Sequence, residues 1–167
     1  KFDSVTACRA QLFGITSISM DHNHILGNDI MQIATEKIAA LQPRCKVFYV
    51  QQLEKINQKI KKQCKINNSI CTPVKTNINL KLSLNGEHQK ENASLALAIS
   101  KDIIKLSNHN IRNCLMSINW HGRNQILSKN PDIIFDVGHN EEGIQSFLNF
   151  IHNYNKTYRK KILLLSI

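Results

Sequence analysis

The stretch that decides the fold runs from Gly14 to Val50, "GITSISMDHNHILGNDIMQIATEKIAALQPRCKVFYV". Residues 14–20 predict a short, mostly buried strand. Residues 29–41 carry apolar side chains at helical spacing, which predicts a helix that ends before Pro43. Residues 46–50 then predict a second strand. Because a strand, a helix and a strand in this order are typical of a parallel sheet, the sequence predicts an α/β fold.

One residue of the predicted helix does not fit its apolar face. At ~100° per residue, four positions spaced i, i+3, i+7 and i+11 share that face: Ile30, Ile33, Lys37 and Leu41. The aliphatic stem of Lys37 can lie along the apolar surface with its ammonium group in water, or the side chain can turn inward for a chemical purpose. On this stretch alone, the first interpretation is favoured.

The sequence on the C-terminal side extends the α/β pattern. The expected elements are a basic amphipathic helix over 51–66, an alternating strand over 76–84, a long helix from near His88, a polar break over 107–125, a strand over 132–136, a helix over 141–154 and a strand over 160–167. We expect a domain boundary within the polar break, because Asn, His and Gly gather there.

Composition and charge limit the class of protein. With 42% hydrophobic and 20% charged residues the chain is globular, and it contains no apolar run of the ~20 residues that span a bilayer. The net charge of +10 is compatible with nucleic acid, a membrane surface or acidic small molecules, but enrichment in Lys, Asn and Ile also produces it. No aromatic residues interleave with the lysines of 51–66, so a solvated face is expected there rather than a nucleic-acid patch.

The cysteines and the two ends of the chain add further expectations. Five cysteines without a CxxC pair predict neither a zinc knuckle nor a disulfide framework, and they suit a reducing cytoplasm. The first residues lack an initiating methionine and the apolar core of a secretory signal, so the sequence is expected to start within a longer protein. Residues 160–167 end the chain in a predicted buried strand, which also suggests a fragment.

Two predicted strand ends are candidate ligand sites. Asp21 and His22 follow the first strand, and Asp136 closes the strand over 132–136 before Gly138-His139-Asn140 leads into a helix. Ligands of α/β proteins bind at the carboxyl edge of the sheet, and helix N-termini accept anions there. The alternative for the second spot is an ordinary loop with a helix cap.

Four ordered motifs resemble a known family. They are "FDSVTACRAQLFGITSISMDHNHILGNDIMQIATEKIAALQP" over 2–43, "GEHQKENASLALAI" over 86–99, "WHGR" over 120–123 and "PDIIFDVGHN" over 131–140. Together they resemble the Mur ligase superfamily, and above all its folate branch, the folylpolyglutamate and dihydrofolate synthases. The resemblance implies an ATP-dependent ligase that phosphorylates a carboxylate and lets the amine of L-glutamate attack the acyl phosphate. It also implies part of a Mur-ligase-type parallel-sheet ATPase domain over 1–118, and a linker with the start of a Rossmann-like C-terminal domain over 119–167.

The resemblance implies residues that bind a metal ion and the folate. His22 matches the family's magnesium-binding histidine, and Lys37 matches a lysine that CO2 carbamylates. A carbamate turns the lysine into an oxygen ligand suited to Mg2+, so the resemblance favours the inward interpretation of this side chain. Phe2, Asp3 and Ser4 resemble the segment that lines the family's pterin pocket.

The resemblance also implies a nucleotide side. Asn92 matches the asparagine that contacts adenine, and Arg123 the linker arginine that reaches the phosphates. Asp136 and His139 match the aspartate and histidine of the loop that faces the nucleotide. His121 departs from the family pattern, which has a proline there.

The implied partners are ATP, L-glutamate and a folate or dihydropteroate acceptor, for a cytoplasmic monomer that binds neither nucleic acid nor membrane. No GxxGKS-type phosphate loop occurs in the sequence, so the chain alone is expected to lack ligase activity. Two alternatives stay open: a cell-wall Mur-type ligase, and a non-catalytic basic remnant of the fold. Residues 2–4 and the "WHGR" motif favour the folate ligase.

Overall fold

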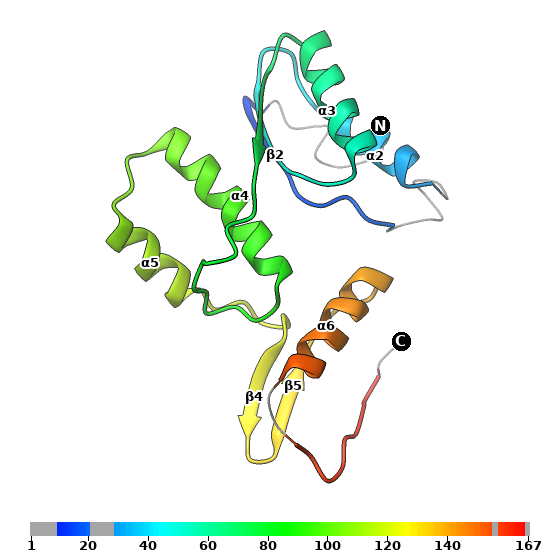
Figure 1. The fold of residues 1–167 in the computed structure, drawn as a ribbon, viewed down its shortest axis with the longest axis vertical. Coiled ribbons are helices and arrows are strands. Elements are labelled where there is room, and N and C mark those ends of the chain that lie inside the picture. The colour runs from blue at the N-terminus through cyan, green and yellow to red at the C-terminus, as the bar shows by residue number, and fades with distance from the viewer. Residues whose placement is uncertain (1–9, 21–28, 155–156, 166–167) are drawn as a thin grey trace.

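The computed structural model describes residues 10–20, 29–154 and 157–165. Along the chain these residues form β1 (Leu12–Ile15), α2 (Ile30–Ile38), β2 (Lys46–Val50), α3 (Glu54–Ile66), β3 (Ile70–Val74), α4 (His88–Ile103), α5 (Asn108–Ser117), β4 (Gln125–Lys129), β5 (Asp132–Phe135) and α6 (Glu141–Asn153) (Figure 1). No helix of the described ranges combines the length and the apolar character needed to cross a membrane.

The first three strands form a parallel sheet in the order β1-β2-β3. Phe13 of β1 pairs with Val47 of β2, which in turn pairs with Cys71 of β3. The strand, helix and strand expected over 14–50 are therefore confirmed, and so is the α/β fold class. The first strand ends at Ile15 rather than at Met20.

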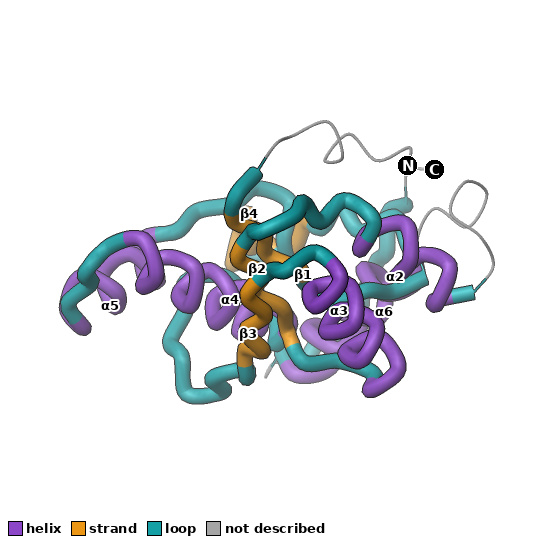
Figure 2. Tube along the Cα trace, turned by 90° about the horizontal axis from the view of Figure 1, so that it is seen from above, coloured by secondary structure: helices purple, strands orange, loops and turns teal. Residues whose placement is uncertain are grey.

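Helices cover both faces of this sheet, as Figures 1 and 2 show: α2 and α3 lie on one side and α4 on the other. Successive residues of β2 point to opposite faces. Val47 and Tyr49 pack with buried residues of α2 and α3, whereas Phe48 and Val50 pack against Leu95 of α4. Burial on both faces is what a central strand of an α/β sheet requires.

The alternating segment 76–84 is not a strand, contrary to expectation. Its backbone N–H groups form hydrogen bonds with two helices instead of with a neighbouring strand. The N–H of Asn77 donates to Ser94 Oγ of α4 (2.9 Å), and the N–H of Ser83 donates to the carbonyl of Leu115 in α5 (3.1 Å). The third strand lies earlier, at β3, where the sequence analysis expected none.

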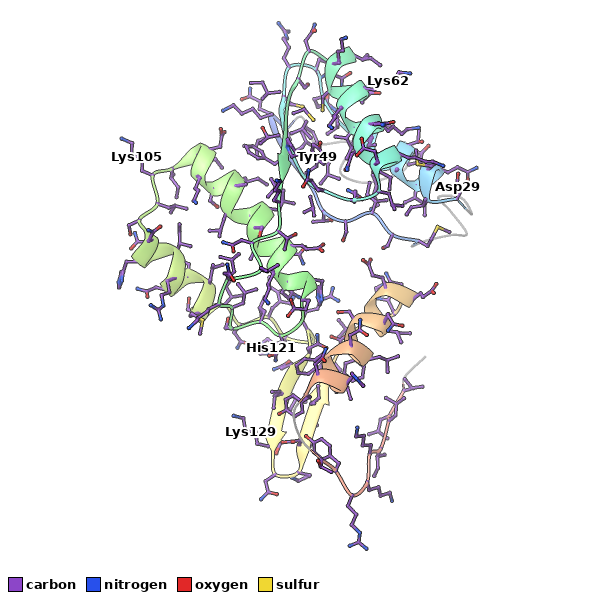
Figure 3. The ribbon with its side chains drawn as sticks, viewed as in Figure 1. Asp29, Tyr49, Lys62, Lys105, His121 and Lys129 are labelled. Atoms are coloured by element: carbon purple, nitrogen blue, oxygen red, sulfur yellow. The ribbon has the colours of Figure 1, made fainter. Side chains whose placement is uncertain are left out.

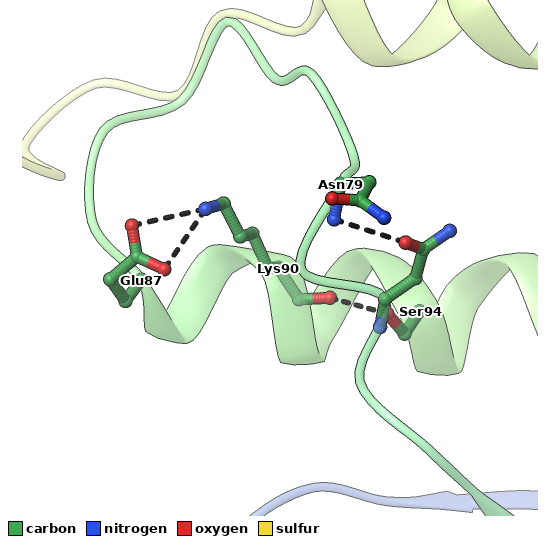
Figure 4. Close-up of polar contacts among 5 residues, drawn as sticks. Asn79, Glu87, Lys90 and Ser94 are labelled. Carbon is green, nitrogen blue, oxygen red and sulfur yellow. Dashed lines mark hydrogen bonds and ion pairs between the residues drawn. The ribbon is translucent and has the colours of Figure 1, made fainter.

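Ser94 also contacts its own helix, in the turn that begins α4. Its hydroxyl donates to the carbonyl of Lys90 (2.7 Å), and the Lys90 ammonium donates to both carboxylate oxygens of Glu87 (3.0 and 3.1 Å) (Figure 4). Because Ser94 also accepts the N–H of Asn77, it joins segment 76–84 to α4.

The polar break over 107–125 contains a helix, α5, that the sequence analysis missed. Ser107 begins it, because its hydroxyl accepts the N–H of Asn110 (3.1 Å). This is the side-chain cap that satisfies an otherwise unpaired N–H of the first turn.

The Ser107 cap gives a stability prediction. Ser107→Ala is expected to lower the free energy of unfolding by about 1 kcal/mol, because the N–H of Asn110 loses its acceptor. Urea unfolding of the chain measures this, and Ser107→Asn, which keeps a capping oxygen, is expected to stay close to wild type. Equal stability of the alanine variant and wild type would contradict the role of the cap.

The C-terminal part consists of an antiparallel hairpin, β4–β5, followed by α6. β5 and α6 match the expected strand and helix, whereas β4 was not expected. The strand expected over 160–167 is wrong for the described residues 160–165, which form no regular structure and expose Leu164. Within the described ranges no strand lies beside them to supply hydrogen-bond partners.

The positive charge is dispersed over the molecule. Lys62 on α3, Lys105 after α4 and Lys129 in the hairpin are exposed and lie in three separate regions (Figure 3). The labelled Tyr49, by contrast, lies in the core between the sheet and its helices.

Candidate functional site

An open cavity of about 910 Å³ lies beside the N-terminal half of α4. Four of the residues singled out from the sequence line it: Lys37, Asn92, Arg123 and Asp136. They come from α2, α4, the segment before β4 and the end of β5. The fold therefore gathers residues separated by up to about a hundred positions at one cavity.

Of the other predicted site residues, the structure describes His139, which is not part of this lining. His139 is exposed, and its Nδ1 lies 3.3 Å from the carbonyl oxygen of Val137. Phe2, Asp3, Ser4 and His22 lie outside the described residues.

Lys37 is exposed at the cavity, so the inward orientation expected from the resemblance is wrong for this structure. Ile33, Ala34 and Ile38 bury the face of α2 that meets the sheet. Helical spacing puts Lys37 on the same face, but its side chain is exposed, because a long side chain can keep its polar end in water. Among the described residues no group of three or more His, Cys, Asp or Glu side chains is arranged to hold a metal ion.

Asn92 lies on the second turn of α4, where α4 faces the cavity. The side chain is exposed, and its amide nitrogen donates a long hydrogen bond to Gln89 Oε1 (3.4 Å). The amide oxygen and the second N–H can therefore reach a ligand as acceptor and donor.

Asp136 ties together the two loops that flank the cavity. Its Oδ2 accepts the N–H of Asn124 (2.8 Å), and its Oδ1 accepts the N–H of Gly138 (2.7 Å). One carboxylate therefore fixes both the segment before β4 and the loop after β5.

The loop after β5 approaches α6 closely, because Gly138 of the loop contacts Gly143 in the first turn of that helix. A Cβ on Gly138 would lie 3.0 Å from the carbonyl carbon of Gly143, and a Cβ on Gly143 would lie 3.1 Å from Gly138 Cα. Between them, Asn140 begins α6, and its Oδ1 accepts the N–H of Gly143 (2.8 Å). The helix cap of the alternative interpretation is therefore present at this spot.

His88 belongs to the site although the sequence analysis treated it only as the start of a helix. It lines this cavity and an adjoining one of about 740 Å³. Its Nδ1 lies 2.7 Å from Ser146 Oγ of α6, and its Nε2 lies 2.9 Å from the amide nitrogen of Gln89. Because an amide nitrogen only donates, Nε2 accepts and the ring is neutral. Nothing local in the sequence marks a partner 58 positions away.

Burial lowers the pKa of His88, and the positive charge of Arg123 lowers it further, while Asp136 and Glu142 act in the opposite direction. Since the folded state binds the proton less readily than the unfolded state, His88 contributes stability fully above the unfolded pKa of about 6.5. That contribution is lost as the pH falls through this value toward the lower pKa of the folded state.

The His88 titration gives a pH prediction. The free energy of unfolding of wild type is expected to fall more between about pH 7.5 and about pH 5.5 than that of His88→Gln, which carries no ionisable group at this position. Urea unfolding at the two pH values measures the difference. His152→Gln, at an exposed position of α6, is the control. The same pH dependence in wild type and His88→Gln would refute the prediction.

The comparisons with known proteins agree with the sequence motifs. No protein-family model matches the chain. A dihydrofolate synthase/folylpolyglutamate synthase of Bacillus subtilis is 29% identical over 174 aligned residues, which cover 87% of this chain. A folylpolyglutamate synthase of Candida albicans is 30% identical over 80% of this chain. Over most of its length the chain is similar to folylpolyglutamate synthases. It spans 40% of the length of the Bacillus relative and 31% of the Candida relative.

Solved folylpolyglutamate synthase structures share the fold. The E. coli FolC structure in complex with DHPP and ADP superimposes with a TM-score of 0.79 at 20% identity, covering 92% of this chain and 41% of that protein. The ADP complex of Mycobacterium tuberculosis folylpolyglutamate synthase gives a TM-score of 0.77 at 22% identity, covering 89% and 40%. These likenesses show that the described elements have the arrangement found in folylpolyglutamate synthases.

Proposed function

We propose that the protein containing this chain is an ATP-dependent ligase of folate metabolism that joins L-glutamate to tetrahydrofolate, to dihydropteroate or to both. The observation that carries the proposal is the single cavity lined by Lys37, Asn92, Arg123 and Asp136. These are four of the residues that the family resemblance singled out, and they come from four separate segments. The sequence relatives named folylpolyglutamate synthase add independent support.

In this proposal the nucleotide occupies the cavity. Asn92 hydrogen-bonds the adenine edge with its free amide groups, and the planar guanidinium of Arg123 binds phosphate oxygens. Asp136 keeps the two flanking loops in place through its bonds to Asn124 and Gly138. His139 lies in the same loop, outside the lining, and contacts the nucleotide from the rim.

The proposal includes Mg2+ as the cofactor, held by His22 and by a carbamate on Lys37. The exposed amine of Lys37 fits this role, because CO2 dissolved in water reaches it and the carbamate adds a hard oxygen donor to the cavity. When bound, the ion supplies charge neutralisation for the phosphate groups. Phe2, Asp3 and Ser4 contribute to the folate pocket.

The reaction follows from this arrangement of partners. The terminal phosphoryl group of ATP passes to the folate carboxylate, and the amine of L-glutamate then attacks the acyl phosphate and releases phosphate. The proposal assigns the central ATPase domain to 1–118 and the linker with the start of the C-terminal domain to 119–167. It describes a cytoplasmic monomer.

The test is ADP release by the protein that contains this chain. Release is expected to require ATP, L-glutamate and tetrahydrofolate or dihydropteroate together, and the product is expected to contain one more glutamate by mass spectrometry. Omission of each substrate in turn is the control. ADP release with a cell-wall peptide precursor but not with either folate would replace this proposal by the cell-wall alternative.

A further inference from the structure

Asn124, the neighbour of Arg123, is a buried polar residue at a turn. Its exposed fraction is 1%, whereas Arg123 beside it is exposed at the cavity. The backbone of Asn124 has φ +45°, a left-handed conformation that asparagine tolerates better than most residues. A buried, left-handed asparagine beside the phosphate-binding candidate therefore requires a physical reason.

Three hydrogen bonds hold Asn124, and they reach two other segments of the site. Its N–H donates to Asp136 Oδ2 (2.8 Å). Its carbonyl accepts Asn85 Nδ2 (2.8 Å), and its own Nδ2 donates to the carbonyl of Asn85 (3.3 Å). Asn85 lies three residues before α4, the helix that carries Asn92. Asn124 is thus the point where the segments bearing Asn92, Arg123 and Asp136 meet.

The other neighbour of Arg123 is also fixed. The carbonyl of Gly122 accepts the N–H of Val137 (3.0 Å), and Gly122 has φ +75°, where a Cβ would lie 2.7 Å from Val137 Cγ1. The backbone of Arg123 is therefore held on both sides by the Asp136–Val137 segment. A fixed backbone lowers the entropy lost when a long, exposed side chain binds a ligand.

Asn124 also carries a cost. Its Oδ1 is buried and has no hydrogen-bond partner among the described residues. The Nδ2 group donates to a carbonyl, so exchanging the two amide atoms would leave Nδ2 without a partner in place of Oδ1. An unsatisfied buried acceptor opposes folding, which means that the side chain is not explained by stability alone.

We propose that Asn124 is a positioning residue for nucleotide binding: it joins the Asn85, Arg123 and Asp136 segments and so holds Arg123 at the cavity. The inference rests on the proposed function, because it takes Arg123 as the phosphate-binding group. It assigns a role to a residue that the sequence analysis did not single out.

The decisive variant is Asn124→Gly in the protein that contains this chain. Glycine adopts φ +45° without strain and removes both the Nδ2 donor and the unpaired Oδ1, so the urea midpoint is expected to stay near that of wild type. Glycine keeps the backbone hydrogen bonds of residue 124 to Asp136 and Asn85 but loses the Nδ2 bond to the carbonyl of Asn85. The kcat/KM for ATP is expected to fall about tenfold, mainly through KM, because the more flexible backbone holds Arg123 less firmly. Asn85→Ala, which removes the contact from the other side, is expected to act in the same direction.

A double-mutant cycle separates positioning from a general structural effect. In an Arg123→Ala background, Asn124→Gly is expected to change kcat/KM for ATP by less than about twofold. Asn68→Gly is the matched control, since Asn68 also has a positive φ but is exposed at the end of α3, and it is expected to leave ATP kinetics unchanged.

Two results would overturn the inference while leaving the proposed function intact: wild-type ATP kinetics in Asn124→Gly, or the same fold loss with and without Arg123. A wild-type protein with no folate-dependent ADP release would overturn the proposed function and the inference with it. The three outcomes are distinguishable in one set of assays.

Discussion

Replacement of Lys37 by arginine is expected to lower the rate of folate-dependent ADP release by at least about a hundredfold. Arginine keeps the positive charge but cannot form the proposed carbamate, and so removes the oxygen ligand proposed for Mg2+. Because Lys37 is exposed, this substitution is expected to change stability little, so a folding defect would not explain such a loss. The same conservative change at exposed Lys62 of α3, Lys62→Arg, is the matched control and is expected to leave the rate unchanged.

A second readout detects the carbamate itself. Incubation of the protein with isotopically labelled bicarbonate is expected to give a carbamate signal in the NMR spectrum of wild type and none in Lys37→Arg. Full activity of Lys37→Arg, or an identical signal in both proteins, would return Lys37 to the first interpretation: a stem on an apolar surface with its ammonium in water.

Truncation of Arg123 is expected to have the next largest effect. Arg123→Ala removes the proposed charge-assisted contact to phosphate, worth about 1.5–3 kcal/mol, so kcat/KM for ATP is expected to fall roughly ten- to hundredfold. Arg123→Lys keeps the charge but not the two-pronged geometry, and a smaller loss is expected. Steady-state kinetics with varied ATP measure both variants.

Arg112→Ala is the control for Arg123→Ala, because Arg112 is an exposed arginine of α5 outside the cavity lining. It is expected to keep the ATP kinetics of wild type. Unchanged kinetics in Arg123→Ala would remove Arg123 from the nucleotide site. Equal losses in both arginine variants would point to net charge instead.

The sequence predicted the parts of the fold whose side-chain periodicity reflects burial. In β2 each residue after Lys46 is buried, and α2 and α3 present apolar stripes to one face of the sheet, so the local pattern and the tertiary environment agree. The alternation over 76–84 misled because its apolar positions are not buried on a sheet: Ile78, for example, is 70% exposed. β3 was missed because Pro73 interrupts a short run, which an edge strand tolerates.

The site residues that belong to sequence motifs were predictable, whereas the contacts between residues far apart in the sequence were not. Asn92, Arg123 and Asp136 belong to quoted motifs, and they line one cavity. The contact between His88 and Ser146, and the pairing of Asn85 with Asn124, join residues 58 and 39 positions apart. Such pairs leave no periodic signal in one sequence. The predicted orientation of Lys37 was wrong because helical spacing gives the face of a helix on which a residue lies, but not whether a long side chain on that face keeps its end in water.

The contact between Gly138 and Gly143 restricts how this protein can diverge. A methyl group at either position meets the backbone of the other glycine, so each single substitution displaces the loop after β5 or the first turn of α6. Either single substitution creates a steric conflict, and a second substitution at the other glycine does not remove it. We therefore expect natural variants and selected libraries to retain both glycines or to change the number of residues between them. Insertions and deletions, rather than point substitutions, are then the evolutionary route by which this loop acquires a new shape.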